Sequence, residues 1–320
     1  MALMPAADID VTEPLVRRLL TEQFPDLAGL PLRLAASGWD NTIFRLGSNL
    51  AVRLPRREAA AHLIEHEQRW LPQLTVGLAM LTPTPVRCGT PSSFFPWPWS
   101  VTPWIQGTTA AAQPLSARRA WAAELANFVD GFQQPAPADA PANPVRGVPL
   151  RMRDEHVRRR LAGGHVPRAR EVERLWSSLE ALPPWEGPAI WLHGDLHPAN
   201  LVTQSGMLAA VMDFGDLTAG DPATDLAAAW LVFDPEGRRI FREHLDARRE
   251  IGTATWQRAR AGRWSWRRRC WHIPMTTRPS GGWATTCWHR CSTADPAGGS
   301  FRRPRWDCWR GGARPGRRCR

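Results

Sequence analysis

The sequence predicts an α+β protein made of two unlike lobes, followed by a C-terminal segment of different composition. Short apolar segments that flank turns fill the first third and are typical of antiparallel sheet. Apolar residues at helical spacing dominate the middle of the chain. We therefore expect a small antiparallel-sheet lobe at residues 1–105, a mostly helical lobe at 106–252 and an atypical, poorly ordered tail at 253–320.

The first lobe is expected to alternate helix and strand. Leu15, Leu19 and Leu20 share one face of a first helix, and a Ser-Gly-Trp-Asp-Asn turn separates the first two strands. The expected helices are Pro14–Phe24 and Glu58–Leu74, and the expected strands are Leu32–Ala36, Thr42–Leu46 and Leu50–Leu54.

The second lobe is expected to be mainly helical, with two short strands beside its polar motifs. A loop with five prolines covers 133–149, and Ser116 is placed to cap the helix before it. The expected helices are Ser116–Phe132, Arg151–Leu161, Arg168–Leu182, Asp221–Phe233 and Gly237–Arg249, and the strands are Ile190–Leu192 and Leu208–Met212.

Charge is distributed unevenly along the chain. Residues 253–320 hold 16 Arg against two acids, whereas the first 252 residues carry a net charge of −3. The chain has no Lys, so Arg must serve wherever a function calls for a cation. No segment is long and apolar enough to cross a membrane, and Cys88 is the only Cys before the tail, so we expect a cytoplasmic protein.

Two polar motifs follow apolar strands in the second lobe. The first runs from His193 through Asp195 to Asn200, and the second is Asp-Phe-Gly beginning at Asp213. One carboxylate beside an acceptor hydroxyl can take its hydrogen bond, while a second carboxylate and an amide oxygen suit magnesium. Alone, His193 is as well explained as a core histidine and Asp195 as a turn residue, but together the two motifs indicate phosphoryl transfer.

The motif His-Gly-Asp-Leu-His-Pro-Ala-Asn, beginning at His193, resembles the catalytic loop of the aminoglycoside phosphotransferase family, a branch of the protein-kinase-like fold. Gly220–Ala227 also matches the family, over a resemblance that covers about Leu15 to Trp256. The resemblance implies a nucleotide donor (ATP or GTP), magnesium and a small-molecule hydroxyl acceptor. It further implies that Asp225 ties its helix to the catalytic loop; from the residues alone, Asp225 could equally be a helix-start carboxylate.

The first lobe contains candidate nucleotide-binding residues. Arg53 stands where the resemblance implies a strand lysine that reaches the phosphates, and otherwise it is a surface arginine on an edge strand. Glu67 is the expected partner of Arg53, with Glu65 as the second choice. The nucleotide loop is expected in the Ser-Gly-Trp-Asp-Asn turn, which is also explained as a plain hairpin; its candidate residues are Ser37, Gly38 and Asn41.

The acceptor is less visible in the sequence. Asp216 and Asp221 beside the metal site would attract a polycation such as an aminoglycoside, and Asp216 is a candidate substrate-binding residue. Alternative acceptors in the same fold are a macrolide, choline, homoserine or a sugar. A different class of function is a pseudoenzyme that binds nucleotide or a partner without turnover.

The tail allows four interpretations. Interleaved Arg and Trp fit a nucleic-acid-binding arm, and Cys and His a zinc site, but Cys287 and Cys291 lack a second pair at the usual spacing. A disulfide scaffold does not fit a cytoplasmic enzyme. We favour translation in a shifted frame of a GC-rich gene and expect no nucleic-acid partner. The helices that complete the acceptor site in the family would then be missing, so we expect weak or absent transfer.

Overall fold

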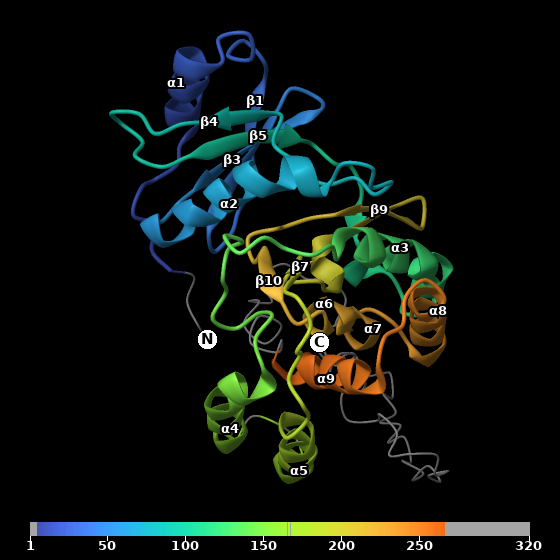
Figure 1. Cartoon of the computed structure of the whole chain (residues 1–320). Helices are drawn as coiled ribbons and strands as arrows, with labels where there is room; N and C mark the ends of the chain where they lie inside the picture. The colour runs from blue at the N-terminus through green and yellow to red at the C-terminus, as the bar shows by residue number, and fades with distance from the viewer. Residues whose placement is uncertain (1–4, 165, 167, 266–320) are drawn as a thin grey trace, which may run out of the picture.

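The computed structural model describes residues 5–164, 166 and 168–265, and the side chains up to residue 262. The chain forms two lobes (Figure 1). The upper lobe is built on an antiparallel sheet and the lower lobe is mostly helical. The predicted α+β, two-lobed architecture is therefore confirmed.

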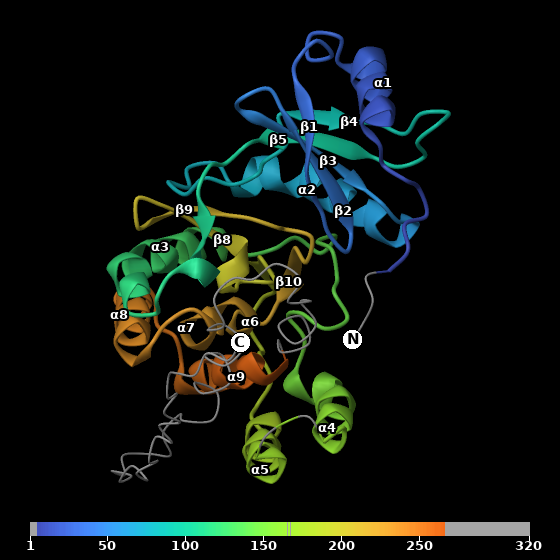
Figure 2. The same ribbon diagram turned by 180° about the vertical axis from the view of Figure 1, so that it is seen from behind.

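The N-terminal lobe is a five-stranded antiparallel sheet in the order β1-β2-β3-β5-β4 (Figure 2). Helix α1 buries Leu19 and Leu20 in a core shared with the strands, as its apolar spacing predicted. Leu15, the third residue expected there, is only partly buried, and Val16 is buried in addition. The elements are α1 (Glu13–Gln23), β1 (Leu32–Ser37), β2 (Asn41–Leu46), β3 (Leu50–Pro55), α2 (Glu58–Leu74), β4 (Arg87–Gly89) and β5 (Trp99–Pro103).

Helix α2 connects the cores of the two lobes. It contacts β3 and β5, and it buries Ile64 and Glu67 on the same side. Its C-terminal part belongs to the core of the second lobe, where the rings of Trp70 and Trp191 lie 5.0 Å apart. Since one rigid helix is anchored in both lobes, the side chain of Glu67 is held between them.

The C-terminal lobe surrounds two small sheets, β7 with β10 and β6 with β8 and β9. Its strands are β6 (Thr108–Thr109), β7 (Ile190–Leu192), β8 (Leu201–Gln204), β9 (Met207–Val211) and β10 (Thr218–Gly220). Its α-helices are α3 (Ala122–Phe132), α4 (Asp154–Ala162), α5 (Ala169–Glu180), α6 (Ala223–Leu226), α7 (Ala228–Leu231), α8 (Pro235–Asp246) and α9 (Thr253–Ser265). Helices α4 and α5 pack on each other at the far end of this lobe (Figure 1).

Three expected helices differ in detail, one of them because the helix expected over Arg151–Leu161 begins as the 3-10 helix Leu150–Arg153. The segment before α3 is a 3-10 helix, Ala117–Trp121, and Ser116 makes no capping hydrogen bond to it. The helix expected over Asp221–Phe233 divides into α6 and α7, on either side of Ala227. Trp121 and Leu226, at the other two places, are fully or almost fully buried.

The boundary expected between the second lobe and the tail is corrected by helix α9. Trp256 and Ala259 of this helix lie in the core of the second lobe, and Arg258 makes a buried ion pair with Asp221 at 2.7 Å. Residues 253–265 therefore belong to the second lobe, not to the tail. The rest of the expected tail, 266–320, lies outside the described residues.

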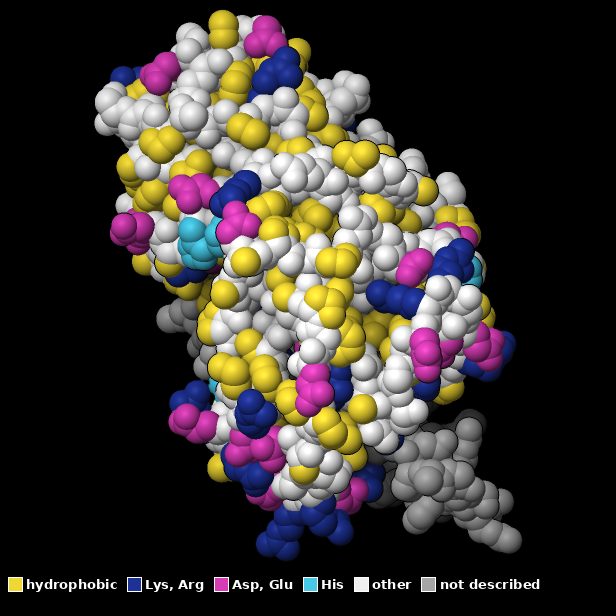
Figure 3. Space-filling view, in the orientation of Figure 1, with side chains coloured by type: hydrophobic (Ala, Val, Ile, Leu, Met, Phe, Trp, Pro, Cys, Tyr) yellow, Lys and Arg dark blue, Asp and Glu magenta, His cyan; other side chains and the backbone are white. Residues whose placement is uncertain are grey.

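Arginines of the described surface are largely interspersed with acids. On the face shown in Figure 3, basic and acidic side chains lie next to one another in the lower lobe. Arg158 pairs with Asp154 at 2.8 Å on α4, and Arg239 pairs with Glu236 at 2.7 Å on α8. Among residues 5–265, as far as they are described, no helix is long and apolar enough to cross a membrane.

Candidate active site

The catalytic loop between β7 and β8 is stabilised from within by His193. The buried ring accepts a hydrogen bond from the backbone N–H of Asp195 on Nδ1 (3.1 Å), so Nε2 carries the proton and donates to the carbonyl of Met212 (2.9 Å). The ring of Phe214 lies 4.5 Å away. His193 thus joins the loop to the Asp-Phe-Gly segment.

Asp225 at α6 holds the same loop from outside. Its buried carboxylate accepts the backbone N–H groups of His193 (2.7 Å) and Gly194 (3.0 Å). Burial raises the pKa of Asp225, while His193 and these two hydrogen bonds oppose the rise. Gly194 has φ +79°, and a Cβ there would lie 2.1 Å from the carbonyl oxygen of Asp216, so only glycine fits.

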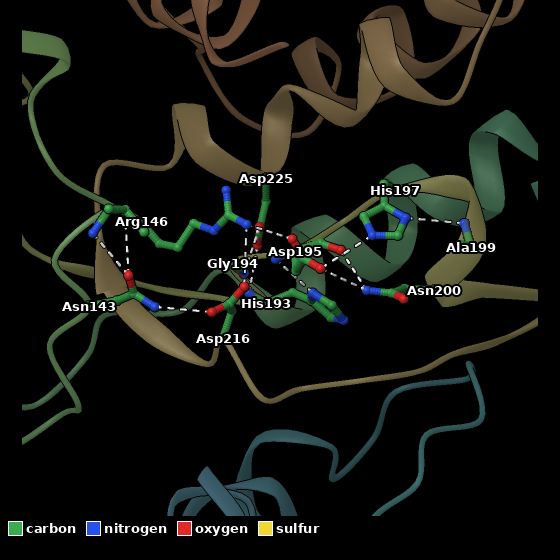
Figure 4. Close-up of polar contacts among 11 residues, drawn as sticks. Asn143, Arg146, His193, Gly194, Asp195, His197, Ala199, Asn200, Asp216 and Asp225 are labelled. Atoms are coloured by element: carbon green, nitrogen blue, oxygen red, sulfur yellow. Dashed lines mark hydrogen bonds and ion pairs between the residues drawn. The ribbon is translucent and has the colours of Figure 1, made fainter. Parts of the chain in front are cut away.

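Asp195 is almost fully buried, and both of its carboxylate oxygens are engaged (Figure 4). Oδ1 accepts from the guanidinium of Arg146 at 2.6 Å. Oδ2 lies 3.2 Å from Nδ2 of Asn200 and 3.2 Å from Nε2 of His197. Because Nδ1 of His197 accepts the backbone N–H of Ala199 at 3.1 Å, Nε2 carries the hydrogen that faces Asp195. The carboxylate is therefore held in one orientation.

The candidate metal ligands, Asn200 and Asp213, lie beside one end of the β8–β9 pair. Asn200 directly precedes β8, Asp213 is the second residue after β9, and the backbone N–H of Met212 between them donates to the carbonyl of Asn200 (2.8 Å). Asn200 directs its Nδ2 at Asp195, and within the described part of the chain its Oδ1 has no hydrogen bond. Asp213 has φ +62° and is exposed. These hard oxygen donors fit a magnesium ion. These two residues are the ones that would hold the ion; in the residues that the structure describes, no cluster of three His, Cys, Asp or Glu side chains could do so.

The structure pairs Arg53 with Glu67, the first of its two candidate partners. Both side chains are buried, with two hydrogen bonds between them, one from NH2 to Oε1 at 3.1 Å. Burial by itself lowers the pKa of Arg53, but the carboxylates of Glu67 and Asp213 raise it above the usual value. Glu65 is exposed. Arg53 is therefore no surface residue: it is buried beside Glu67 and lies within electrostatic range of Asp213.

The candidate nucleotide loop is the turn between β1 and β2. The backbone N–H of Gly38 donates to the carbonyl of Asn41 (2.9 Å), and Arg56 donates to the carbonyl of Gly38 (2.9 Å). Ser37 and Gly38 are exposed, and Oδ1 of Asn41 is buried with no hydrogen-bond partner among the described residues. The turn is thus ordered by its own hairpin bond and by an arginine from the end of β3.

Arg146 is a site residue that sequence reasoning missed. It comes from the proline-rich loop 133–149 and contacts both Asp195 and Asp216, the latter at 3.3 Å (Figure 4). Asn143 of the same loop donates to Asp216 at 3.3 Å. No spacing relates this loop to the catalytic motif; the proline content signalled only an irregular segment.

The two acids expected to attract a polycation are both paired with arginine. Asp216 is bound by Arg146, and Asp221 accepts two hydrogen bonds from Arg258, at 2.7 and 3.2 Å. Asp221 is buried. These acids therefore take part in contacts that hold the lobe and its loop.

The two lobes, the catalytic loop fastened by Asp225 and the acid at Asp213 define a kinase-like phosphotransferase. The chain belongs to the phosphotransferase enzyme family, whose sequence pattern matches residues 31–261. This match ends inside α9, in agreement with the corrected boundary of the second lobe. A comparison with curated proteins finds no match.

Solved structures with the same fold include antibiotic phosphotransferases. The GDP complex of aminoglycoside 2'-phosphotransferase-IIIa is 17% identical over 88% of this chain and 98% of that one, with a TM-score of 0.62. The GDP and kanamycin complex of APH(2")-IIia is 18% identical over 78% and 88%, with a TM-score of 0.60. The macrolide 2'-phosphotransferase MphH from Brachybacterium faecium is 16% identical over 88% and 99%, with a TM-score of 0.52.

Proposed function

We propose that this chain transfers the γ-phosphoryl group of ATP or GTP to a hydroxyl of a small molecule. The observation that carries the proposal is the environment of Asp195. Its carboxylate is buried and fixed by three side chains, and it is hydrogen-bonded to Asn200, which lies next to Asp213. An acceptor-orienting base beside hard metal ligands is the arrangement that phosphoryl transfer needs.

Asp195 acts as the acceptor-orienting base. An ionised carboxylate only accepts hydrogen bonds and has about four lone-pair sites, one of which takes the acceptor O–H in this proposal. The fixed carboxylate would align that oxygen with the phosphoryl group and take its proton late in the transfer. Magnesium held by Asn200 and Asp213 would neutralise charge on the phosphoryl oxygens.

Arg53 contacts the nucleotide phosphates in this proposal, steadied by Glu67. A guanidinium binds phosphate through a planar fork, whereas a lysine ammonium acts as a compact charge. Glu67 already occupies one side of the fork, and it therefore fixes the direction in which the remaining N–H groups point. Ser37, Gly38 and Asn41 would lie over the nucleotide at the β1–β2 turn.

The acceptor class that the neighbours favour is an aminoglycoside-type antibiotic, since kanamycin is named with one of them, and a macrolide is the second class. The pairing of Asp216 and Asp221 with arginines favours neither polycation binding nor the substrate role expected for Asp216. The experiments below therefore test the class of reaction and the identity of the acceptor separately. We expect the reaction to take place in the cytoplasm.

The tail expected to be translated in a shifted frame was 253–320, and because α9 packs in the second lobe we now limit that proposal to residues 266–320. We propose that transfer is weak for that reason, and that a pseudoenzyme would result if it is absent. Sequencing the gene and its relatives tests the first step: a one-base change should restore a helical C-terminus that contains acids. Robust turnover by the 320-residue chain would contradict the weak-transfer proposal.

The proposed function is tested by binding first and transfer second. Thermal melting with ATP or GTP should show stabilisation that requires magnesium. A panel of aminoglycosides, macrolides, choline, homoserine and sugars then reports acceptor-dependent formation of ADP or GDP. Nucleotide binding without transfer to any acceptor would favour the pseudoenzyme, and stabilisation that is independent of magnesium would contradict the metal site.

A further inference from the structure

Arg146 is positioned by a loop whose backbone is fixed on both sides of the residue. The backbone N–H groups of Val145 and Arg146 donate to Oδ1 of Asn143, at 3.0 and 3.1 Å. The next residue, Gly147, donates its N–H to Oγ1 of Thr224 (3.0 Å). Gly147 has φ +68°, and a Cβ there would lie 2.9 Å from the carbonyl oxygen of Ala219. These contacts hold the loop in one conformation, with Arg146 directed toward Asp195.

The guanidinium of Arg146 lies on the acceptor side of the site. It contacts Oδ1 of Asp195, the carboxylate that an acceptor hydroxyl must reach, and it also contacts Asp216. Any molecule that brings a hydroxyl to Asp195 must therefore lie beside this cation. Because Arg146 already faces two carboxylates, binding of an anionic substituent at this place requires a second cation.

Arg153 supplies a second cation close by, on the 3-10 helix Leu150–Arg153 that follows the loop. It is 8% exposed, and within the described part of the chain it has no hydrogen bond and no ion pair. Other buried arginines have such partners, as Arg118 has the carbonyl of Val232 and Arg258 has Asp221. Arg153 is therefore a largely buried cation for which the described residues supply no hydrogen-bond or ion-pair partner.

The electrostatic environment of Arg153 explains what would bind there. Burial, followed by the charges of Arg146 and Arg160, lowers the pKa of Arg153 to about 9, and Asp216 opposes the shift. The side chain still carries its charge at neutral pH, so the folded protein bears the cost of an unpaired buried cation. A bound anion would offset that cost and fill the donor sites of the guanidinium.

We propose that the acceptor carries an anionic group, a carboxylate or a phosphate, which Arg153 and Arg146 bind while its hydroxyl reaches Asp195. This inference rests on the proposed phosphoryl transfer and names the acceptor class for it. The substrate is thus a hydroxy acid or a phosphorylated hydroxyl compound. A polycationic aminoglycoside would place ammonium groups beside two arginines.

Matched acceptors test the charge preference. Glucose, gluconate, glucose 6-phosphate and glucosamine, with glycerol, glycerate and glycerol 3-phosphate as a smaller set, are compared at equal ionic strength for nucleotide consumption by the full chain. An anionic member should have a kcat/KM at least tenfold above its neutral counterpart, and gluconate against glucose 6-phosphate separates carboxylate from phosphate. A neutral or cationic member that is fastest in both sets, or a faster aminoglycoside, would overturn the proposal.

Variants of Arg153 link the preference to the residue. Arg153→Met should lower the ratio of anionic to neutral kcat/KM about tenfold, the size of one lost charge-assisted hydrogen bond, and Arg153→Lys should restore part of it. Arg159→Met, on the exposed side of α4, is the matched control and should leave the ratio unchanged. An equal loss for all acceptors would make Arg153 a structural residue and overturn the proposal.

A binding measurement keeps this inference separate from phosphoryl transfer. Inorganic phosphate and glycerol 3-phosphate should raise the melting temperature of the wild-type chain but not of Arg153→Met, while the ligand-free variant should melt higher than wild type, since an unpaired buried charge is removed. Failure of transfer together with Arg153-dependent anion binding would reject the proposed function and retain the anion site. Equal stabilisation of both proteins by phosphate, or a lower melting temperature of the ligand-free variant, would reject the site.

Discussion

Arg146 and Asp195 form an ion pair at 2.6 Å, although 49 residues separate them in the chain. The pair joins the proline-rich loop to the catalytic loop. Because the same guanidinium reaches Asp216 at 3.3 Å, it also ties the segment after Asp213 to the base. The orientation of Asp195 therefore depends on a loop that lies outside every motif of the sequence.

Replacing Arg146 should slow the reaction through this contact. In Arg146→Met the carboxylate loses one of its three fixed partners, and kcat should fall about ten- to a hundredfold, the range of one charge-assisted hydrogen bond. Arg146→Lys should recover only part, because an ammonium lacks the fork that spans two carboxylates. Steady-state kinetics at saturating nucleotide measure this, and an unchanged kcat in Arg146→Met would remove the residue from the mechanism.

Breaking the Arg53–Glu67 pair by removing one partner should lower the free energy of unfolding strongly, whereas replacing both residues with apolar side chains should lower it little. Glu67→Ala leaves Arg53 as an uncompensated buried charge and should lower the free energy of unfolding in urea by about 3–5 kcal/mol. The double variant Arg53→Met, Glu67→Leu should regain most of that stability but still bind nucleotide poorly. Glu65→Ala, on the exposed side of the same helix, is the control. Equal losses in Glu65→Ala and Glu67→Ala would contradict the buried pair.

Asp225 should stabilise the fold and, through the loop that it holds, should also affect kcat. Asp225→Ala leaves the backbone N–H groups of His193 and Gly194 without acceptors, at about 1–3 kcal/mol for each buried donor. Chemical unfolding should therefore show a loss of at least about 2 kcal/mol, with a lower kcat from the loosened loop. Glu236→Ala, at an exposed helix start, is the control and should leave the stability close to that of wild type. A loss in Asp225→Ala no greater than that of the control would be inconsistent with the anchor.

Two truncations test where the second lobe ends. A chain that stops after residue 265 should melt as the full chain does, whereas one that stops after 252 loses the buried Trp256 and the Arg258–Asp221 pair. Deleting a buried Trp side chain alone costs about 3–5 kcal/mol, so the shorter chain should unfold at a clearly lower temperature or fail to fold. Equal melting temperatures of the two truncated chains would mean that the second lobe ends at residue 252, as the sequence first indicated.

Local patterns predicted much of this molecule. Helix α2 was predicted with its observed bounds because apolar side chains recur on one face, and that face also placed Glu67 toward Arg53. The strands expected over Leu32–Ala36 and Leu50–Leu54 match β1 and β3 to within one residue. These features depend on residues close in sequence or on one regular element.

Local sequence patterns could not predict contacts that depend on the tertiary fold. The position of Arg146 follows from a loop whose path is fixed by hydrogen bonds to Thr224 and Asn143, and no spacing encodes them. The unpartnered state of Arg153 is likewise a property of packing. Helix α9 was assigned to the tail because its Arg and Trp content resembles that of residues 266–320, although Trp256 and Arg258 serve the core.

The most direct test of the account is the turnover of Asp195→Ala. Acceptor-dependent, magnesium-dependent loss of the γ-phosphoryl group should fall about 10²- to 10⁴-fold relative to wild type, as expected for a general base, while the nucleotide Kd stays within about twofold. Turnover that survives the substitution, or loss of nucleotide binding together with turnover, would contradict the role of Asp195 as the acceptor-orienting base.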